Sequence, residues 1–167
     1  MPLQKLQDLF VAQLHELHAG EAASIEALRT LQGVTTNSRL LRALQAHEAE
    51  SEVHATRLEG IFDELGITPR RGGSQGMKGL CADCLELARL ARVEPHVRDA
   101  AVIAAAQRIE HDEMAGYGCA RTWAKLLGHR TIASNLQRSL NEEGRFDAKL
   151  SRLADAMNRA ALEPALA

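Results

Sequence analysis

One segment of the chain, residues 38–65, reads SRLLRALQAHEAESEVHATRLEGIFDEL. Apolar side chains recur there at intervals of three, four and seven residues, and this period places Leu40, Leu44 and Leu58 on one face of an α-helix. Between Leu44 and Leu58 the same face carries histidine and acidic residues instead. The segment therefore predicts a long helix whose buried face contains a polar patch halfway along its length.

The same period predicts helices over most of the remaining chain. We expect Gly33 to end the first helix and Gly66 to end the second. Pro95 is expected to end a short helix in the middle of the chain, and Gly128 to end the helix after it. Asp99 is expected in the first turn of that later helix, where a carboxylate favours the helix dipole. The predicted helices cover approximately residues 3–32, 38–65, 76–93, 97–127 and 131–160.

The composition favours a single all-α domain over residues 1–167, with a short tail after the last helix. The 167 residues include 28 alanines and 24 leucines, and aromatic residues make up only 3%. Alanine and leucine favour helices, whereas β-sheets are rich in β-branched and aromatic residues. A chain of this length can bury a substantial core as one domain.

Charge and hydropathy exclude other classes of protein. A net charge of -2 does not favour a nucleic-acid-binding protein, which needs clustered lysine and arginine. No apolar run reaches the roughly 18–20 residues that cross a bilayer, and the first residues lack the basic start and apolar stretch of a signal peptide. We therefore expect a cytoplasmic protein with neither nucleic acid nor a membrane as a partner.

The lengths of the linkers predict how the long helices connect. Short turns join the first two and the last two long helices, so each pair forms an antiparallel hairpin. About 30 residues separate the hairpins, including a loop at residues 69–74 and the short helix. Two hairpins with one long crossover are the connectivity of ferritin-like bundles. The expected fold is therefore a ferritin-like four-helix bundle whose crossover carries a short fifth helix.

Each of the four long helices places acidic residues on its inward-facing stripe, and the second helix adds two histidines. If the hairpin turns are centred near Thr35 and Gly128, four of these residues lie 14 or 15 residues from a turn, which is about 22 Å at about 1.5 Å per residue: Glu21, Glu50, Glu113 and Glu143. They are therefore expected to meet in one layer at the middle of the bundle. The candidate residues are Glu21, His47, Glu50, His54, Glu110, Glu113, Glu143 and Asp147.

Such a buried layer predicts a metal site. Carboxylates that face one another in a core repel, and they are costly unless they are paired, protonated or bound to cations. Carboxylate and imidazole ligands suit iron and manganese, and bundle cores hold such metals as pairs. The expected cofactor is two Fe or two Mn ions per chain. In the alternative interpretation the glutamates lie on solvated faces, and His54 is a hydrogen-bonded core residue.

Several segments around these residues carry a further indication. They include Leu9-Phe10, Gly20-Glu21, Ala46-His47 and Glu50-Ser51, and the most specific is the run VRDAAVIAAAQRIEHDEMAGYG at residues 97–118. Together they resemble the YciE/YciF family of bacterial stress-associated proteins over nearly the whole chain. The resemblance implies a ferritin-like, rubrerythrin-like fold, a homodimer of helical bundles and a dinuclear metal centre, but no settled activity.

The resemblance also extends to single positions. His54 stands where relatives carry Gln or His, and Asn141 and Gly144 depart from the usual residues of the last helix. The His47-x-x-Glu50 order also reverses the Glu-x-x-His order of typical ferritin-like helices, which leaves the coordination pattern open. The residues that match the family in type are Glu21, His47, Glu50, Glu110, Glu143 and Asp147.

The functional hypothesis is a di-iron or di-manganese protein of the stress response that reacts with oxygen or peroxide. As an enzyme it would be an oxidoreductase of the peroxidase, catalase-like or ferroxidase-like type. Tyr117, the only tyrosine, is the candidate catalytic residue, as a hydrogen-bond donor or a redox group, although a core aromatic is the alternative role. The alternative function is a non-catalytic helical dimer for stress protection or protein interaction.

The remaining cysteines and histidines give weaker indications. Cys81-Ala82-Asp83-Cys84 is a lone CxxC motif, so thiol redox activity is a third hypothesis. In the alternative, Cys84 packs inward and Cys81 lies near the surface. His18 is a candidate to support the layer from outside, and His15 is expected in solvent.

Overall fold

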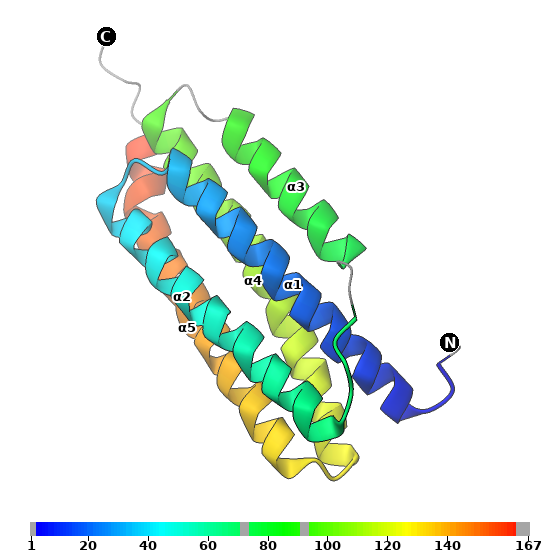
Figure 1. Cartoon of the computed structure of the whole chain (residues 1–167). Coiled ribbons are helices and arrows are strands. Elements are labelled where there is room, and N and C mark those ends of the chain that lie inside the picture. The colour runs from blue at the N-terminus through cyan, green and yellow to red at the C-terminus, as the bar shows by residue number, and fades with distance from the viewer. Residues whose placement is uncertain (1–2, 71–73, 91–93, 163–167) are drawn as a thin grey trace.

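The computed structural model describes residues 3–70, 74–90 and 94–162, and within these ranges the chain forms helices and no strand (Figure 1). The prediction of an all-α fold is confirmed. None of the described helices combines the length and apolar character needed to cross a membrane. The helices are α1 (Leu6–Val34), α2 (Ser38–Leu65), α3 (Gln75–Leu90), α4 (Pro95–Leu126) and α5 (Arg130–Leu162).

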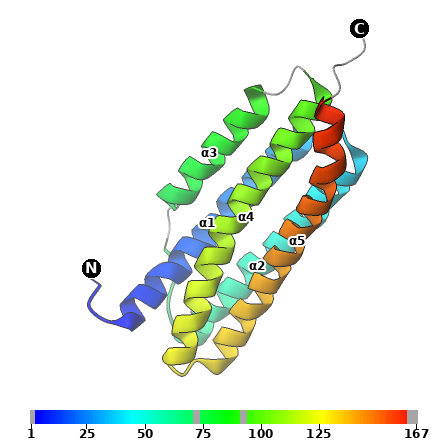
Figure 2. The same ribbon diagram turned by 180° about the vertical axis from the view of Figure 1, so that it is seen from behind.

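The four long helices form a closed ring. Helix α1 packs against α2 and α4, and α5 packs against the same two helices. The α1–α2 turn and the α4–α5 turn lie at opposite ends of the bundle, and the crossover with α3 connects those ends (Figures 1 and 2). Helix α3 lies outside the ring, against α1 and α4. The predicted bundle with a short helix in its crossover is confirmed.

Several helix ends follow the predicted chemistry. The side chain of Asn37 caps α2 by accepting hydrogen bonds from the backbone N–H groups of Arg39 and Leu40, at 2.9 and 3.2 Å. Gly66 ends α2 in the left-handed region with φ 66°, and Gly128 occupies the α4–α5 turn with φ 86°. A glycine lacks the Cβ that makes these angles costly for other residues.

Two expected helix ends were wrong. Gly33 lies inside α1, which continues to Val34 and ends at an extended Thr35. Pro95 does not end the short helix but begins α4, where its missing N–H costs nothing because no partner would exist in the first turn. The expected end of the short helix at residues 91–93 and the loop residues 71–73 lie outside the described residues.

The expected role of Asp99 was also wrong. Asp99 lies in the second turn of α4 and is buried. Its carboxylate accepts hydrogen bonds from the backbone N–H and hydroxyl of Thr36, at 2.8 and 2.6 Å, and from the backbone N–H of Asn37 at 2.9 Å. Asp99 therefore ties the α1–α2 turn to α4, across the two halves of the fold.

Replacing Asp99 with alanine is expected to lower the free energy of unfolding by about 2–4 kcal/mol, because three hydrogen bonds to a buried carboxylate are lost. Urea denaturation at pH 7 measures the change. Asp155→Ala is the matched control, since the side chain of Asp155 on α5 is 84% exposed. A loss at Asp99 no larger than that of the control would contradict the proposed tie.

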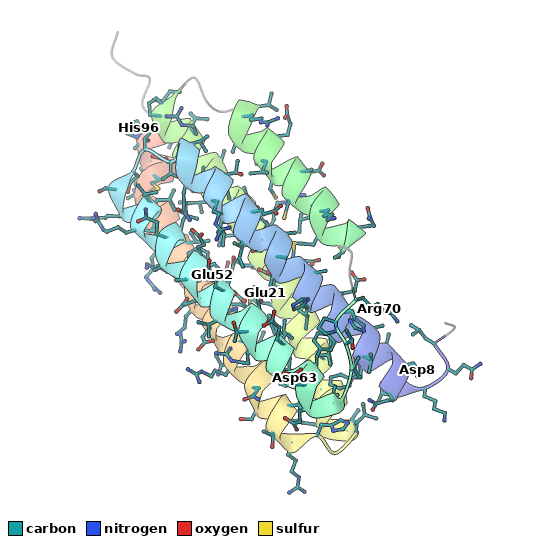
Figure 3. All side chains as sticks on the ribbon, viewed as in Figure 1. Asp8, Glu21, Glu52, Asp63, Arg70 and His96 are labelled. Carbon is teal, nitrogen blue, oxygen red and sulfur yellow. The ribbon has the colours of Figure 1, made fainter. Side chains whose placement is uncertain are left out.

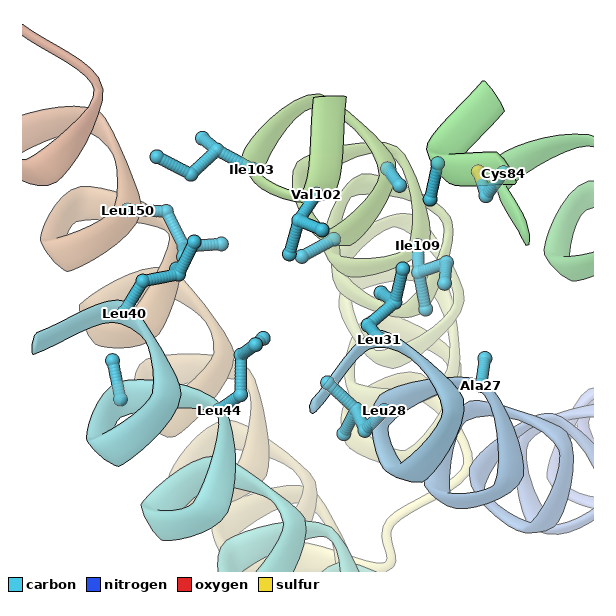
Figure 4. Close-up of a cluster of buried hydrophobic side chains, with 14 of the residues drawn as sticks. Ala27, Leu28, Leu31, Leu40, Leu44, Cys84, Val102, Ile103, Ile109 and Leu150 are labelled. Atoms are coloured by element: carbon cyan, nitrogen blue, oxygen red, sulfur yellow. The ribbon is translucent and has the colours of Figure 1, made fainter. Parts of the chain in front are cut away.

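The apolar core is divided into two parts. One cluster lies towards the α1–α2 turn and contains Leu28, Leu44, Ile109 and Leu150 (Figure 4). The other lies towards the α4–α5 turn and contains Phe10, Phe62 and Leu136, among others. On every long helix, buried polar residues fall between the positions that belong to the two clusters, and Asp99, near the start of α4, is the exception among the described residues. The bundle therefore encloses a polar layer between two apolar ones.

Candidate metal centre

The polar layer is built by all four long helices. Each of its six central residues is at most 2% exposed, and together they offer four carboxylates and two imidazoles. Glu21 lies near the middle of the bundle, far along α1 from Asp8 (Figure 3). The six residues are Glu21 on α1, His47 and His54 on α2, Glu110 and Glu113 on α4, and Glu143 on α5.

The first group of candidate ligands surrounds His47. Its Nε2 atom lies 3.1 Å from Oε1 of Glu110 and 3.4 Å from Oε2 of Glu143. These three residues offer ligand atoms that all lie within 4.8 Å of one another. The ring of His47 stacks on Phe146, with 3.8 Å between ring centroids, which holds the imidazole in place.

The second group surrounds His54. Its Nδ1 atom lies 2.8 Å from Oε1 of Glu143 and 3.4 Å from Oε1 of Glu21. Here too the ligand atoms of the three residues lie within 4.8 Å of one another. Glu143 therefore belongs to both groups, with one oxygen directed towards each histidine. An ion in either group could therefore contact Glu143.

Many polar atoms in this layer are close together without being hydrogen-bonded. Among the described residues, Nε2 of His47, Nδ1 of His54 and both carboxylate oxygens of Glu110 and Glu143 have no hydrogen-bond partner. Distances of 2.8–3.4 Å join several of these atoms, so it is the angles that are unsuitable for hydrogen bonds. Buried polar atoms without partners are rare because they are costly, and these converging atoms form groups that could hold a cation.

Burial and mutual repulsion shift the pKa values of the layer. Burial raises the pKa of Glu113 well above its usual range, and the charges of Glu21, Glu143 and Glu110 raise it further. Burial likewise raises the pKa of Glu110, to about 8, against the opposing effect of His47. Without a metal, the layer therefore retains protons on carboxyl groups at neutral pH.

The two histidines retain protons as well. Burial alone lowers the pKa of His47, but contacts with Glu110 and Glu50 outweigh it and raise the pKa to about 10. The pKa of His54 rises to about 10 in the same way, through Glu143 and Glu21. Burial raises the pKa of Glu143, yet the two histidines lower it further than burial raises it. Glu143 is therefore the anionic centre of the layer.

The outer nitrogen of each histidine faces a further carboxylate. Nδ1 of His47 lies 3.6 Å from Glu50, and Nε2 of His54 lies 3.0 Å from Glu142. Glu142 is itself held by Arg57 at 2.8 Å and by Arg138 at 3.2 Å. Metal-binding histidines usually donate their second N–H to a carboxylate, and the hydrogen bond between His54 and Glu142 fits that pattern, whereas Nδ1 of His47 has no hydrogen-bond partner among the described residues.

Glu50 was predicted within the central layer, but the structure places it outside both ligand groups. Its side chain is 48% exposed and contacts the outer nitrogen of His47. Glu142 was not singled out by the sequence analysis. The signal that could have indicated it is Arg138, four residues earlier on the same helix, which is the spacing of an ion pair across one helical turn.

Asp147 and Tyr117 also border the layer. Asp147 lies one turn beyond Glu143 and accepts a hydrogen bond of 2.9 Å from Gln107, so the structure does not bring it into either group. Tyr117 is fully buried, and its hydroxyl donates a hydrogen bond to Glu21. Burial and the nearby carboxylates raise the pKa of Tyr117 well above its usual value, so the phenol stays protonated as a donor.

The other candidates are not part of the layer. His18 lies 3.6 Å from Glu59, and His15 stacks on Phe62, with 4.8 Å between ring centroids. Cys81 was expected near the surface, but it is buried against α1, and Cys84 is interior as predicted. Burial raises the pKa of Cys81 to about 11, so the reactive thiolate is scarce at neutral pH. The free thiols therefore do not favour the thiol redox hypothesis.

The fold and the buried layer define a ferritin-like helical bundle with a cluster of acidic and histidine residues that could hold metal. One similar solved structure is that of ferritin-like, diiron-carboxylate proteins from Bacillus anthracis strain Ames. The match covers 91% of this chain and 99% of that chain, with a TM-score of 0.70. At 17% identity, this match shows a shared fold. Residues 5–163 match the family described as a domain of unknown function (DUF892), and the chain belongs to that family.

More similar relatives confirm the resemblance expected from the sequence. Protein YciF of Escherichia coli strain K12 is 34% identical over 155 residues, which cover 92% of this chain and 93% of YciF. The crystal structure of the E. coli stress protein YciF has a TM-score of 0.85 and 33% identity, and the match covers 94% of this chain and 99% of that one. The structure of YcfI from Rhodopseudomonas palustris has the same TM-score and identity, with 89% and 94% covered.

Proposed function

We propose that this protein binds a pair of divalent iron or manganese ions in the polar layer and uses them to react with oxygen or peroxide. The observation that supports it is the pair of buried ligand groups that share Glu143. Each group supplies one imidazole nitrogen and carboxylate oxygens, the donor types that iron and manganese accept. Neither group contains a cysteine, so the donor set does not fit a structural zinc site.

The charges of the layer suit this metal pair. Four buried carboxylates carry four negative charges when ionised, and two divalent ions carry four positive charges. Neutral histidines then leave the site without net charge, which is the least costly state in a core. The orphaned atoms of Glu110, Glu143, His47 and His54 would gain partners at the same time.

When bound, such a pair supplies one electron per ion, and these two electrons with two protons reduce one peroxide to two water molecules. Glu143 would hold both ions, with His47 and Glu110 completing one position and His54 and Glu21 the other. Tyr117, which is fully buried, donates a hydrogen bond to Glu21 and so orients a residue of the second position. The apolar clusters on both sides keep bulk water out of the layer.

Anaerobic loading with Fe(II) or Mn(II), followed by metal analysis of the desalted protein, tests the proposal. The expected result is two ions per chain, together with consumption of added peroxide by the iron form. A protein that takes up no metal would overturn the proposal and favour the non-catalytic helical dimer. We also propose, on the family resemblance, that the chain forms a homodimer, which sedimentation equilibrium can test.

Replacing Glu142 with glutamine is expected to weaken metal binding about 10–100-fold, the usual effect of losing an outer partner of a ligating histidine. The reason is that His54 would lose the carboxylate that orients its ring and favours its metal-binding form. Competition titration with a chromophoric chelator measures the affinity. Glu59→Gln, at an exposed position of α2, serves as the control and should bind as the parent does.

A further inference from the structure

A pocket opens on the flank of the bundle where α3 begins. It has a volume of about 240 Å³ and lies between α1 and α4. Gln13 and Glu16 line it from α1, Met77 from α3, and Asp112 and Glu113 from α4. Glu16 and Asp112 are exposed at the surface, whereas Glu113 is 2% exposed.

Glu113 connects this pocket to the polar layer. Its Oε2 atom accepts a hydrogen bond from Ser24 at 3.4 Å, and its Oε1 atom has no hydrogen-bond partner among the described residues. The carboxylates of Glu21, Glu110 and Glu143 are close enough to raise its pKa. The same buried side chain therefore borders both the pocket and the candidate ligands.

The charges of the pocket favour cations. Two exposed carboxylates, Glu16 and Asp112, line it together with the buried carboxyl group of Glu113, and the described residues of its wall include no lysine or arginine. The start of α3 also borders it, but a helix N-terminus contributes only about half a positive charge. Clefts lined by one sign of charge raise the local concentration of the opposite ion.

The opposite flank of the layer has a different character. A pocket of about 130 Å³ between α2 and α5 reaches His47 there, and Arg145 and Lys149 line it beside Glu50. Two basic side chains oppose the approach of a divalent cation from that flank. The two openings are therefore not equivalent for cations.

We propose that the pocket at Glu16, Asp112 and Glu113 is the port through which divalent cations reach the metal centre, an inference that rests on the proposed function. Glu16 and Asp112 attract the hydrated cation at the mouth. The unpartnered oxygen of Glu113 receives it at the inner end and passes it to the neighbouring carboxylates.

The test measures how fast Co(II) binds, under anaerobic conditions, from the rise of its ligand-field absorption in a stopped-flow instrument. The double variant Glu16→Gln/Asp112→Asn is expected to bind Co(II) about tenfold more slowly at low ionic strength, because electrostatic steering contributes on this scale. Its final stoichiometry should remain two ions per chain. Glu16→Lys should slow binding further, and added salt should slow the parent more than the variants.

Glu59→Gln/Asp155→Asn removes the same charge from exposed positions elsewhere, so it controls for net charge. Port variants that bind as fast as this control would overturn the port while leaving the metal centre in place. A parent protein that binds no Co(II) would overturn both proposals. Both port substitutions are at exposed side chains, and circular dichroism confirms that the variants fold.

Discussion

Replacing Glu143 with glutamine is expected to abolish binding of both metal ions at micromolar metal concentrations. One oxygen of Glu143 lies 3.4 Å from Nε2 of His47, and the other lies 2.8 Å from Nδ1 of His54. A neutral amide removes the negative charge that the two positions share and offers only one carbonyl oxygen. After anaerobic loading, metal analysis should find two ions per chain in the parent protein and none in the Glu143→Gln variant.

Two other variants make this expectation specific. Glu110→Gln alters only the group at His47, and Glu21→Gln alters only the group at His54, so each should retain one ion. Asp155→Asn, on the same helix as Glu143 but exposed, should retain two. A Glu143→Gln protein that folds and still binds two ions would contradict the bridging role of this residue.

The position of the layer could be predicted because the long helices are regular. In an antiparallel hairpin, equal distances along the chain from the turn give equal heights, so Glu21 and Glu50, 14 and 15 residues from Thr35, were expected at the same level. The buried apolar residues before and after each polar position confirm that regularity. The fold followed from the same periodicity and from the length of the crossover.

The direction of individual side chains was harder to predict. On α2, His47 and His54 are seven residues apart and share a face, whereas Glu50 lies about 60° to one side at 100° per residue. From periodicity alone, a flanking residue such as Glu50 can face either the interior or the solvent. Which of the two it faces depends on how α5 packs against α2. Glu50 consequently reaches the outer nitrogen of His47.

Helix α4 shows the opposite effect. Glu113 lies about 60° around the helix from Glu110 at 100° per residue, yet both residues are buried. Helix α4 packs against α1, α3 and α5, so little of its circumference faces solvent. The sequence indicated a short helix in the crossover but not the helices that it covers. The hydrogen bonds of Asp99 with the α1–α2 turn could not be predicted either. They join residues more than 60 positions apart, and helical periodicity does not indicate such contacts.

The overall constant for binding both metal ions is expected to weaken at least 100-fold for each unit by which the pH is lowered between pH 8 and pH 6, because each ion displaces the proton of one histidine. Carboxylate neighbours outweigh burial and raise the pKa of His47 and of His54 to about 10, so both imidazoles carry a proton throughout this range. A metal ion needs the lone pair that each proton occupies, and every displaced proton lowers the apparent binding constant about tenfold per pH unit. The protons on Glu110 and Glu113 steepen the dependence further.

Competition titrations with Mn(II) at several pH values measure the slope, and calorimetry in buffers of different ionisation enthalpy counts the released protons. A slope of one or less for this overall constant would show that the two histidines do not both lose their protons, and would therefore contradict their role as ligands of the two ions.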